Sequence, residues 1–314
     1  MEKMYDVIII GSGPAGLSAA IYAQRAKLSS ILIEANYMSG GQMVNTYEVD
    51  NYPGLPGISG MDLGSRMREH AEKMGAVFVQ ERAQELRLEG EIKNVITNKQ
   101  EYRAKTVLLA TGAKHRMLEV PGEQELSGSG VSYCATCDGA FFRDKTVVVV
   151  GGGDVAVEDA IFLARICKEV YVIHRREELR AARVLQDKLF ALDNVRMIWN
   201  SVVTEIQGEF QVKGVRVRNV VTDEVRELEA DGCFIAVGIT PNSELAVSQL
   251  KMDKGGYIEA GEDGVTSIPG VFAAGDVRTK QLRQIITAAA DGANCITSIQ
   301  NYPVSYTHLR AHET

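Results

Sequence analysis

The sequence predicts an α/β protein with two parallel β-sheets, because one strand–glycine–helix plan occurs twice in the chain. The first copy is YDVIIIGSGPAGLSAAIYAQRA (5–26) and the second is TVVVVGGGDVAVEDAIFLARI (146–166). Each begins with a β-branched run that lacks polar alternation, as in a strand buried on both faces, and continues into a helix-period stretch. A further apolar strand follows each helix, at 29–35 and 169–175, and completes a βαβ unit. We therefore predict two Rossmann-like dinucleotide-binding domains, one inserted into the other.

The two copies are predicted to lie in separate domains. They begin at residues 5 and 146 of a 314-residue chain, a separation well above the roughly 20–50 residues of a solenoid repeat. A chain of this length also exceeds what one hydrophobic core usually supports. Glycine and proline in EVPGE (119–123) and GITPNSE (238–244) mark the expected crossings between the domains. The predicted first domain has two segments, 1–116 and 242–303, and the inserted second domain is 117–241.

The remaining elements fit the same scheme. Apolar strands are predicted at TVLLATGA (106–113), DGCFIAVGI (231–239) and GVFAAGD (270–276), and a helix over 281–300 returns to the first domain. The last segment, 304–314, lacks any apolar period, so we expect a disordered or non-native tail.

The composition narrows the classes of partner. The net charge is −7 and no run of lysine and arginine exceeds two residues, which argues against nucleic acid or an anionic membrane as the main partner. No apolar run approaches the roughly 20 residues that span a bilayer. The amino terminus has only four consecutive apolar residues before glycine, too few for a signal peptide. We therefore expect a cytoplasmic protein.

The first glycine cluster predicts a dinucleotide site. GSGPAG follows a strand and opens a helix, so backbone N–H groups at the helix start can bind a pyrophosphate. Glu34 ends the next strand, where a carboxylate can hold ribose hydroxyls. The residues assigned to this part of the site are Gly11, Ser12, Gly13, Pro14, Ala15, Gly16 and Glu34.

The second glycine cluster differs from the first at the end of its second strand. Gly151, Gly153 and Asp154 repeat the loop, but the second strand (169–175) ends in histidine and arginine, at the start of HRREELR (174–180), and not in an acid. An arginine fork binds a 2′-phosphate, which a carboxylate would repel. The segment therefore predicts NADP(H) rather than NAD(H), bound by His174, Arg175, Arg176 and Arg180. Two nucleotides on one chain most simply form a flavin–nicotinamide pair, so we expect FAD in the first site and NADPH in the second.

The chain has five cysteines, of which only Cys134 and Cys137 are close enough in sequence to act together. A zinc site would need more ligands than this C-x-x-C offers, and we expect no metal. A static disulfide is unexpected in a compartment that keeps thiols reduced. The spacing favours a reversible disulfide, and the adjacent Asp138 is either its proton donor or an ordinary first-turn acid of a helix.

Taken together, these motifs resemble the low-molecular-weight, prokaryotic-type thioredoxin reductases of the pyridine nucleotide-disulfide oxidoreductase family. The resemblance covers residues 4–303 and departs mildly at Asp154-Val155, where the family often has another small polar pair. The motifs that carry it are GSGPAG, GGQMVNTYEVDNYPG (40–54), ATGA (110–113), CATCDGAFF (134–142), GGGDVAVEDA, HRREELRA, VFAAGD and RQIITAAADG (283–292).

The resemblance implies a role for each matching position. Cys137 would lie nearer the flavin, Cys134 would attack the protein substrate and Asp138 would protonate a leaving thiolate. Three arginines, 175, 176 and 180, would clamp the 2′-phosphate. The family is homodimeric, and its inserted domain rotates about hinges that correspond to 114–121 and 238–244. The remaining flavin-binding positions would be Gly41, Gln42, Asn51, Thr111, Gly112, Asp276, Arg283 and Gln284.

The expected activity is NADPH-dependent reduction of a protein disulfide, with thioredoxin as the expected substrate. A ferredoxin- or flavodoxin-type NADPH reductase shares the two-nucleotide architecture but would not need the two cysteines. Another small dithiol protein could replace thioredoxin. The flavin subunit of an alkyl hydroperoxide reductase would need a redox domain before the first strand, and a flavin-bound redox sensor would show no turnover.

Overall fold

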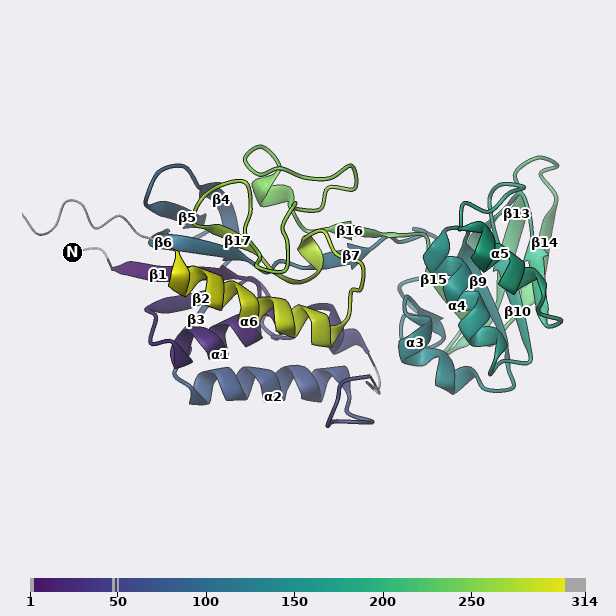
Figure 1. Ribbon diagram of the computed structural model, residues 1–314. Helices are drawn as coiled ribbons and strands as arrows, with labels where there is room; N and C mark the ends of the chain where they lie inside the picture. Colours follow the sequence, from purple (N-terminus) through teal and green to yellow (C-terminus); the bar gives the residue numbers. More distant parts are fainter. Residues whose placement is uncertain (1–2, 47–48, 50, 303–314) are drawn as a thin grey trace, which may run out of the picture. The chain divides into compact units, whose positions relative to one another are not determined.

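The computed structural model describes residues 3–46, 49 and 51–302 (Figure 1). The predicted tail therefore lies outside the described residues. The described chain forms two compact units. Unit 1 combines stretches 3–44, 58–114 and 240–302, and unit 2 combines 115–239 with the described residues of 45–57.

Unit 1 is built on a seven-stranded sheet with the order β3-β2-β1-β6-β5-β4, in which β17 also pairs with β6. Strands β1, β2, β3, β6 and β17 are parallel, and β5 and β4 join as antiparallel neighbours. The predicted strands 29–35, 106–113 and 270–276 overlap β2, β6 and β17, but β6 ends at Leu109 and β17 at Ala273, short of the predicted ends. The strand bounds are β1 Met4–Ile10, β2 Ser30–Glu34, β3 Phe78–Gln80, β4 Ala83–Arg87, β5 Lys93–Thr97, β6 Glu101–Leu109 and β17 Val271–Ala273.

The central strand β1 is buried on both faces, as its continuous apolar run predicts. Val7 and Ile9 pack under the helices α1 (Pro14–Arg25), α2 (Gly60–Lys73) and α6 (Ile285–Asn301). Ile8 and Ile10 face a second core, closed by β4, β5 and the loops of residues 245–268. Figure 1 shows α1, α2 and α6 together along one side of this sheet. Because these strands are parallel, their carboxyl ends all lie at the edge of the sheet where α1 follows β1.

Helix α6 approaches α1 more closely than ordinary side chains permit. A Cβ atom at Gly292 of α6 would collide with the carbonyl oxygen of Ala15 at the start of α1. The glycine therefore lets α6 dock directly against the glycine cluster that opens α1.

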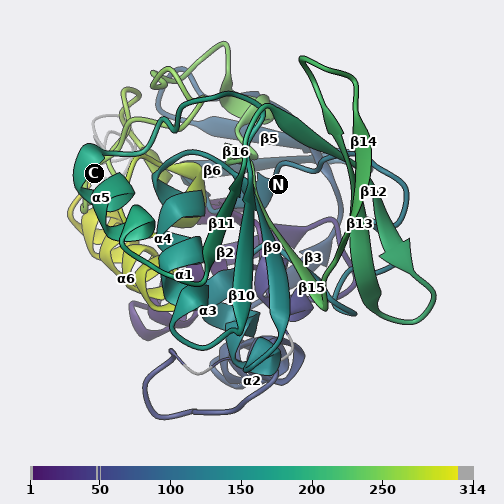
Figure 2. The same cartoon turned by 90° about the vertical axis from the view of Figure 1, so that its right-hand side faces the viewer.

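Unit 2 has a five-stranded parallel sheet with the order β11-β10-β9-β15-β8. Strands β9, β10, β11 and β15 of this sheet are labelled in Figure 2. The predicted strands 169–175 and 231–239 appear as β10 and β15. One face packs on the helices α3, α4 and α5, and the other packs on a three-stranded antiparallel sheet, β12-β13-β14. The parallel strands are β8 Val131–Ser132, β9 Thr146–Gly151, β10 Glu169–Ile173, β11 Val195–Ile198 and β15 Gly232–Ala236. The covering elements are α3 Ala135–Asp138, α4 Asp154–Ala164, α5 Arg183–Phe190, β12 Ser201–Gly208, β13 Val212–Asn219 and β14 Val225–Glu229.

The antiparallel strands of both units were not predicted. Two short strands, β7 (Ala113–His115) and β16 (Ile239–Pro241), form a further two-stranded sheet where the chain passes between the units. Within the described residues, none of the helices combines the length and the apolar character needed to cross a membrane.

Candidate functional site

The first glycine cluster forms an open cradle at the end of β1. Gly11 has φ +105°, and a Cβ atom at Gly16 would collide with the carbonyl oxygen of Gly11. Gly13 caps α1, whose first turn closes through the Leu17 N–H bond to the Gly13 carbonyl at 2.9 Å. A Cβ atom at Gly13 would meet nothing within 4 Å. Free space beside the N-terminus of a helix is what a pyrophosphate requires, so the loop fits a dinucleotide.

Glu34 anchors this loop from the neighbouring strand. Its Oε2 accepts hydrogen bonds from the backbone N–H of Ser12 at 2.9 Å and from the Ser12 hydroxyl at 2.8 Å. Its Oε1 accepts from the N–H of Asn36 at 2.7 Å. The carboxylate thus lies beside the cradle, as the sequence predicts, and it also fixes the position of the loop.

Two glycine substitutions should separate binding from folding at this loop. We expect Gly13→Ala to keep the unfolding free energy of the flavin-free protein within about 1 kcal/mol of wild type, because its methyl group meets no neighbour. The same methyl group occupies the cradle, so FAD affinity should fall sharply. Gly16→Ala should instead cost about 1–3 kcal/mol or more in stability. Denaturant unfolding and equilibrium FAD titration measure both quantities, and unchanged affinity in Gly13→Ala would place the pyrophosphate elsewhere.

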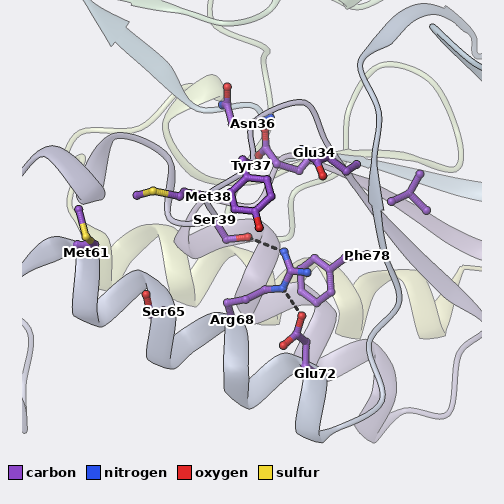
Figure 3. Close-up of a pocket in the computed structure, with 12 residues that line it drawn as sticks. Glu34, Asn36, Tyr37, Met38, Ser39, Met61, Ser65, Arg68, Glu72 and Phe78 are labelled. Carbon is purple, nitrogen blue, oxygen red and sulfur yellow. Dashed lines mark hydrogen bonds and ion pairs between the residues drawn. The ribbon is translucent and has the colours of Figure 1, made fainter.

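A pocket of about 520 Å³ opens next to Glu34, between the loop after β2, helix α2 and strand β3 (Figure 3). Arg68 of α2 forms one wall. Its guanidinium carbon lies 3.3 Å from the centre of the Phe78 ring, its Nη1 donates to the Ser39 hydroxyl at 3.0 Å and its Nε donates to Glu72 at 2.7 Å. These four residues were missed from the sequence, because they come from three separate segments and none of them belongs to a motif.

The turn η4 (Gly275–Val277) presents Asp276 at the end of β17. Its Oδ1 is buried and has no hydrogen-bond partner among the described residues, and neither has the buried Nε of Arg283. Burial raises the pKa of Asp276, against the opposing charges of Lys280 and Arg283. The Arg283 guanidinium also lies 4.1 Å from the centre of the Tyr257 ring. Buried polar atoms without partners fit a polar ligand such as the ribityl chain of a flavin.

A buried ion cluster supports this turn and was not foreseen from the sequence. Asp291 of α6 is 5% exposed, and its Oδ2 accepts from the Gly275 N–H at 2.8 Å and from Lys280 at 2.9 Å. Arg278 donates to Asp291 Oδ1 at 2.6 Å and to its Oδ2 at 2.9 Å. Burial would raise the pKa of Asp291, but the hydrogen bonds from Arg278 and Lys280 outweigh it, and the pKa is lowered.

Asp291→Asn should therefore cost about 3–5 kcal/mol of unfolding free energy at neutral pH, because it leaves two buried cations without their anion. Since the folded pKa is lowered, this contribution is present above the unfolded pKa of about 3.9 and is lost as the pH falls through the folded value. The half-exposed Asp6–Lys105 pair provides the control, and Asp6→Asn should cost about 1 kcal/mol. Denaturant unfolding at pH 7 and at low pH measures the difference, and equal losses in the two variants would refute a special role for the cluster.

The structure brings several other predicted residues to the same edge of unit 1. A Cβ atom at Gly41, the first residue of η1 (Gly41–Asn45), would lie 3.3 Å from the Cα of Gly13, and Gln42 follows it exposed. A Cβ atom at Gly11 would collide with the carbonyl oxygen of Ala110, so the segment with Thr111 and Gly112 lies directly beside the cradle.

The other positions predicted to bind the flavin are the 111–112 segment, Gln284 and Asn51. Asn242 holds the 111–112 segment by donating to the carbonyls of Thr111 and Gly112, each at 2.9 Å. Gln284 precedes α6 and donates its N–H to Thr287 at 3.2 Å. Asn51 belongs to unit 2, so its place beside the flavin residues of unit 1 stays a prediction.

The second glycine cluster is drawn together with the basic segment after β10. The Arg180 N–H donates to the Gly152 carbonyl at 2.7 Å, and a Cβ atom at Gly152 would collide with the His174 ring. Arg180 Nη2 lies 4.0 Å from the position of a Cβ atom at Gly153, which caps α4. Asp154 accepts the N–H of Ala182 at 2.7 Å. The loop and the basic segment therefore form one site.

The second site has three exposed arginines, in a segment that also carries Glu177 and Glu178. Arg175, Arg176 and Arg180 are exposed, and none of them pairs with a carboxylate in the described part of the chain. His174 is buried, and its Nε2 has no hydrogen-bond partner among those residues. Burial and the neighbouring arginines lower the pKa of His174, so the ring is neutral at pH 7. The arrangement fits a phosphate bound by the arginines.

Cys134 and Cys137 form a disulfide at the start of α3, with their Cα atoms 5.3 Å apart. The N–H groups of Cys137 and Asp138 both donate to the Cys134 carbonyl, at 3.2 and 3.1 Å. Asp138 is partly buried, and burial raises its pKa. The disulfide and its adjacent acid thus lie in unit 2, the unit that carries the basic nucleotide loop.

The other three cysteines are free and buried, as predicted. Burial raises the pKa of Cys167 to about 11 and those of Cys233 and Cys295 to about 12. They are therefore protonated and unreactive at neutral pH.

Comparison with known proteins agrees with these features. Residues 5–292 match the family described as pyridine nucleotide-disulphide oxidoreductase. A thioredoxin reductase of Peptoclostridium acidaminophilum is 47% identical, over 96% of this chain and 98% of its own length. A thioredoxin reductase of Bacillus subtilis (strain 168) is 46% identical, over 96% of this chain and 95% of its own.

A solved structure extends the comparison to the fold. The crystal structure of thioredoxin reductase from Streptococcus pyogenes MGAS5005 superposes with a TM-score of 0.89 at 48% identity, and the match covers 96% of this chain and 99% of that one. As its motifs predict, the chain belongs to the pyridine nucleotide-disulphide oxidoreductase family.

Proposed function

We propose that the protein uses NADPH to reduce the disulfide of thioredoxin, through bound FAD and the Cys134–Cys137 pair. The observation that carries this proposal is the disulfide itself, placed next to a carboxyl whose pKa is raised by burial. Neither a nucleotide-binding module nor a ferredoxin-type reductase needs such a pair.

FAD is assigned to unit 1. The open cradle at Gly13 suits its pyrophosphate, and the pocket beside Glu34 suits its adenosine end. Asp276 and Arg283 offer unpartnered polar atoms to the ribityl and ring portions. A bound flavin supplies two-electron chemistry, since it accepts a hydride from a reduced nicotinamide and releases electrons to a disulfide.

NADPH is assigned to unit 2, with Gly151, Gly153 and Asp154 at the loop. Arg175, Arg176 and Arg180 would bind the 2′-phosphate, because charge-assisted hydrogen bonds from guanidinium groups suit phosphate oxygens. In this reading the FAD domain is 1–116 with 242–303, and the NADPH domain is 117–241. The division of the described chain into two compact units supports the assignment.

The steps that the chain's own residues perform take place at the sulfurs of Cys134 and Cys137. Two electrons open the Cys134–Cys137 bond, and Asp138 donates a proton to one of the two sulfurs. The Cys134 thiolate attacks the thioredoxin disulfide and forms a mixed disulfide. Cys137 then attacks Cys134, which releases reduced thioredoxin and restores the starting disulfide. The family resemblance, rather than any contact, supports the order of the two cysteines.

The same resemblance leads us to infer a homodimer in the cytoplasm whose NADPH domain rotates about 114–121 and 238–244. A reductase that must regenerate dithiols belongs where thiols are kept reduced. Rotation would let the nicotinamide and the disulfide use one flavin in turn.

A steady-state assay of the flavin-loaded protein tests the proposal. NADPH oxidation should depend on thioredoxin and should exceed the rates with a glutaredoxin-like protein, ferredoxin or flavodoxin. Turnover with ferredoxin or flavodoxin in a Cys137→Ser variant would instead support the ferredoxin-type reading. An absence of NADPH oxidation with every acceptor would contradict the proposed activity.

A further inference from the structure

Ser132 has an unusual set of contacts beside the disulfide. It ends β8, is 5% exposed and lies opposite Phe234 of β15. Its hydroxyl donates to Asp138 Oδ2 at 2.6 Å and accepts the N–H of Cys134 at 3.1 Å. The Cys134 carbonyl is more distant from the hydroxyl, at 3.3 Å. Since a serine has one hydroxyl proton, the short bond to Asp138 takes it.

These contacts make the two oxygens of Asp138 unequal. Oδ2 is engaged by Ser132, whereas Oδ1 is buried without a hydrogen-bond partner in the described part of the chain. The form of protonated Asp138 that keeps the Ser132 donation to Oδ2 carries its proton on Oδ1. The two N–H bonds to the Cys134 carbonyl keep this carboxyl on the same short turn as both sulfurs.

Few other groups influence this carboxyl. Burial is the main cause of the raised pKa of Asp138, and the Ser132 hydrogen bond opposes it. Burial likewise raises the pKa of Asp159, on the helix α4 that packs against α3, to about 7. The Tyr133 hydroxyl donates to the buried Glu123 at 2.8 Å. The titratable groups on the surrounding elements are Glu123, Tyr133 with the His115 ring stacked on it, Asp154, Glu158 and Asp159 of α4, and Cys233 of β15.

We propose that Ser132 is a positioning residue that holds Asp138 by Oδ2 and so keeps the transferable proton on Oδ1, available to a sulfur of the Cys134–Cys137 pair. The inference rests on the proposed function, in which Asp138 donates a proton. When the sulfur–sulfur bond accepts two electrons and breaks, it leaves two thiolates. One takes the Oδ1 proton and becomes a thiol. The Asp138 carboxylate that remains keeps the serine hydrogen bond, which is stronger to a charged acceptor.

Removing the Ser132 hydroxyl should change the pKa of Asp138 in a predictable direction. The Ser132 hydrogen bond favours the ionised form of Asp138. Ser132→Ala should therefore raise the pKa of Asp138 and shift the alkaline limb of the rate–pH profile to higher pH. It should also lower the thioredoxin-dependent rate at pH 7 about 10-fold, a part of the roughly 10²–10⁴-fold that a positioned proton donor supplies.

The experiment measures kcat/KM for thioredoxin from pH 5 to 10 in the flavin-loaded protein. Infrared difference spectra of the carboxyl band, assigned through Asp138→Asn, give the pKa of Asp138 independently of turnover. Ser132→Thr keeps a hydroxyl and should stay within about 3-fold of the wild-type rate. Ser129→Ala is the matched control, because Ser129 is exposed three residues upstream on the same segment. Ser132→Gly replaces Ser132→Ala if the alanine variant fails to fold.

A higher pKa and a shifted limb in the variants without a hydroxyl, with both unchanged in Ser129→Ala, would support the positioning role. A rate loss with neither the limb nor the carboxyl titration moved would overturn it. The proposed function fails separately, if wild-type protein does not reduce thioredoxin. If wild type is active but Asp138→Asn keeps the same limb, Asp138 is not the donor, and the inference falls with that assignment.

Discussion

Replacing Cys137 with serine is expected to abolish reduction of thioredoxin while leaving FAD bound and reducible by NADPH. The serine hydroxyl cannot form the disulfide that Cys134 and Cys137 share. Loss of one member of a group that acts as a unit costs about 10⁴-fold or more in turnover. Stopped-flow absorbance at the flavin band should therefore show normal bleaching by NADPH, and the thioredoxin-coupled rate should fall to the background.

Cys167→Ala is the matched control, because Cys167 is a free, buried cysteine of the same unit. Its thioredoxin-dependent rate should stay close to wild type once the variant is folded. Full turnover in Cys137→Ser would show that electrons leave the flavin by another route, as in a ferredoxin-type reductase.

Neutralising the three arginines after β10 should change coenzyme preference. Each guanidinium that contacts the 2′-phosphate should contribute about 1.5–3 kcal/mol, so each replacement by glutamine should raise KM for NADPH about 10–100-fold. KM for NADH should change far less, because NADH lacks that phosphate. Steady-state kinetics with both coenzymes measure the ratio. High salt should reproduce part of the effect in wild type but little of it in the triple variant.

Arg165→Gln provides the control for net charge, since Arg165 is exposed at the opposite end of α4 from the glycine loop. It should leave both KM values nearly unchanged. Parallel losses for NADPH and NADH in the Arg175, Arg176 and Arg180 variants would contradict a phosphate clamp.

The elements that could be predicted are those whose sequence pattern is distinct within a short stretch of the chain. A continuous apolar run, a glycine cluster and an alanine-rich helix are adjacent in sequence, so β1–α1–β2 and β9–α4–β10 follow directly. The antiparallel sheet β12-β13-β14 was missed, because its strands lack the continuous apolar runs of the parallel sheets. Its middle strand shows the other pattern, with Val215 and Val217 buried and Arg216 and Arg218 between and beyond them. That alternation is a readable signal for a half-exposed strand.

The site divides in the same way. Glu34 could be placed beside the first glycine cluster, because neighbouring parallel strands end at one edge of the sheet. The ion cluster that supports the Asp276 turn could not be predicted, because the sequence does not show that Asp291 of α6 contacts Arg278 and Lys280 of the preceding loop. Charged residues in a loop are ordinarily exposed, but here they are buried with Asp291 of α6.

Anaerobic titration of the flavin-loaded protein with NADPH, followed by counting of reactive thiols in the folded state, tests the central claim most directly. The account predicts that the flavin band bleaches and that two thiols per chain become reactive, at Cys134 and Cys137, while the three buried cysteines stay silent. A reduced flavin with no newly reactive thiols would contradict the claim that electrons pass from the nicotinamide to this disulfide.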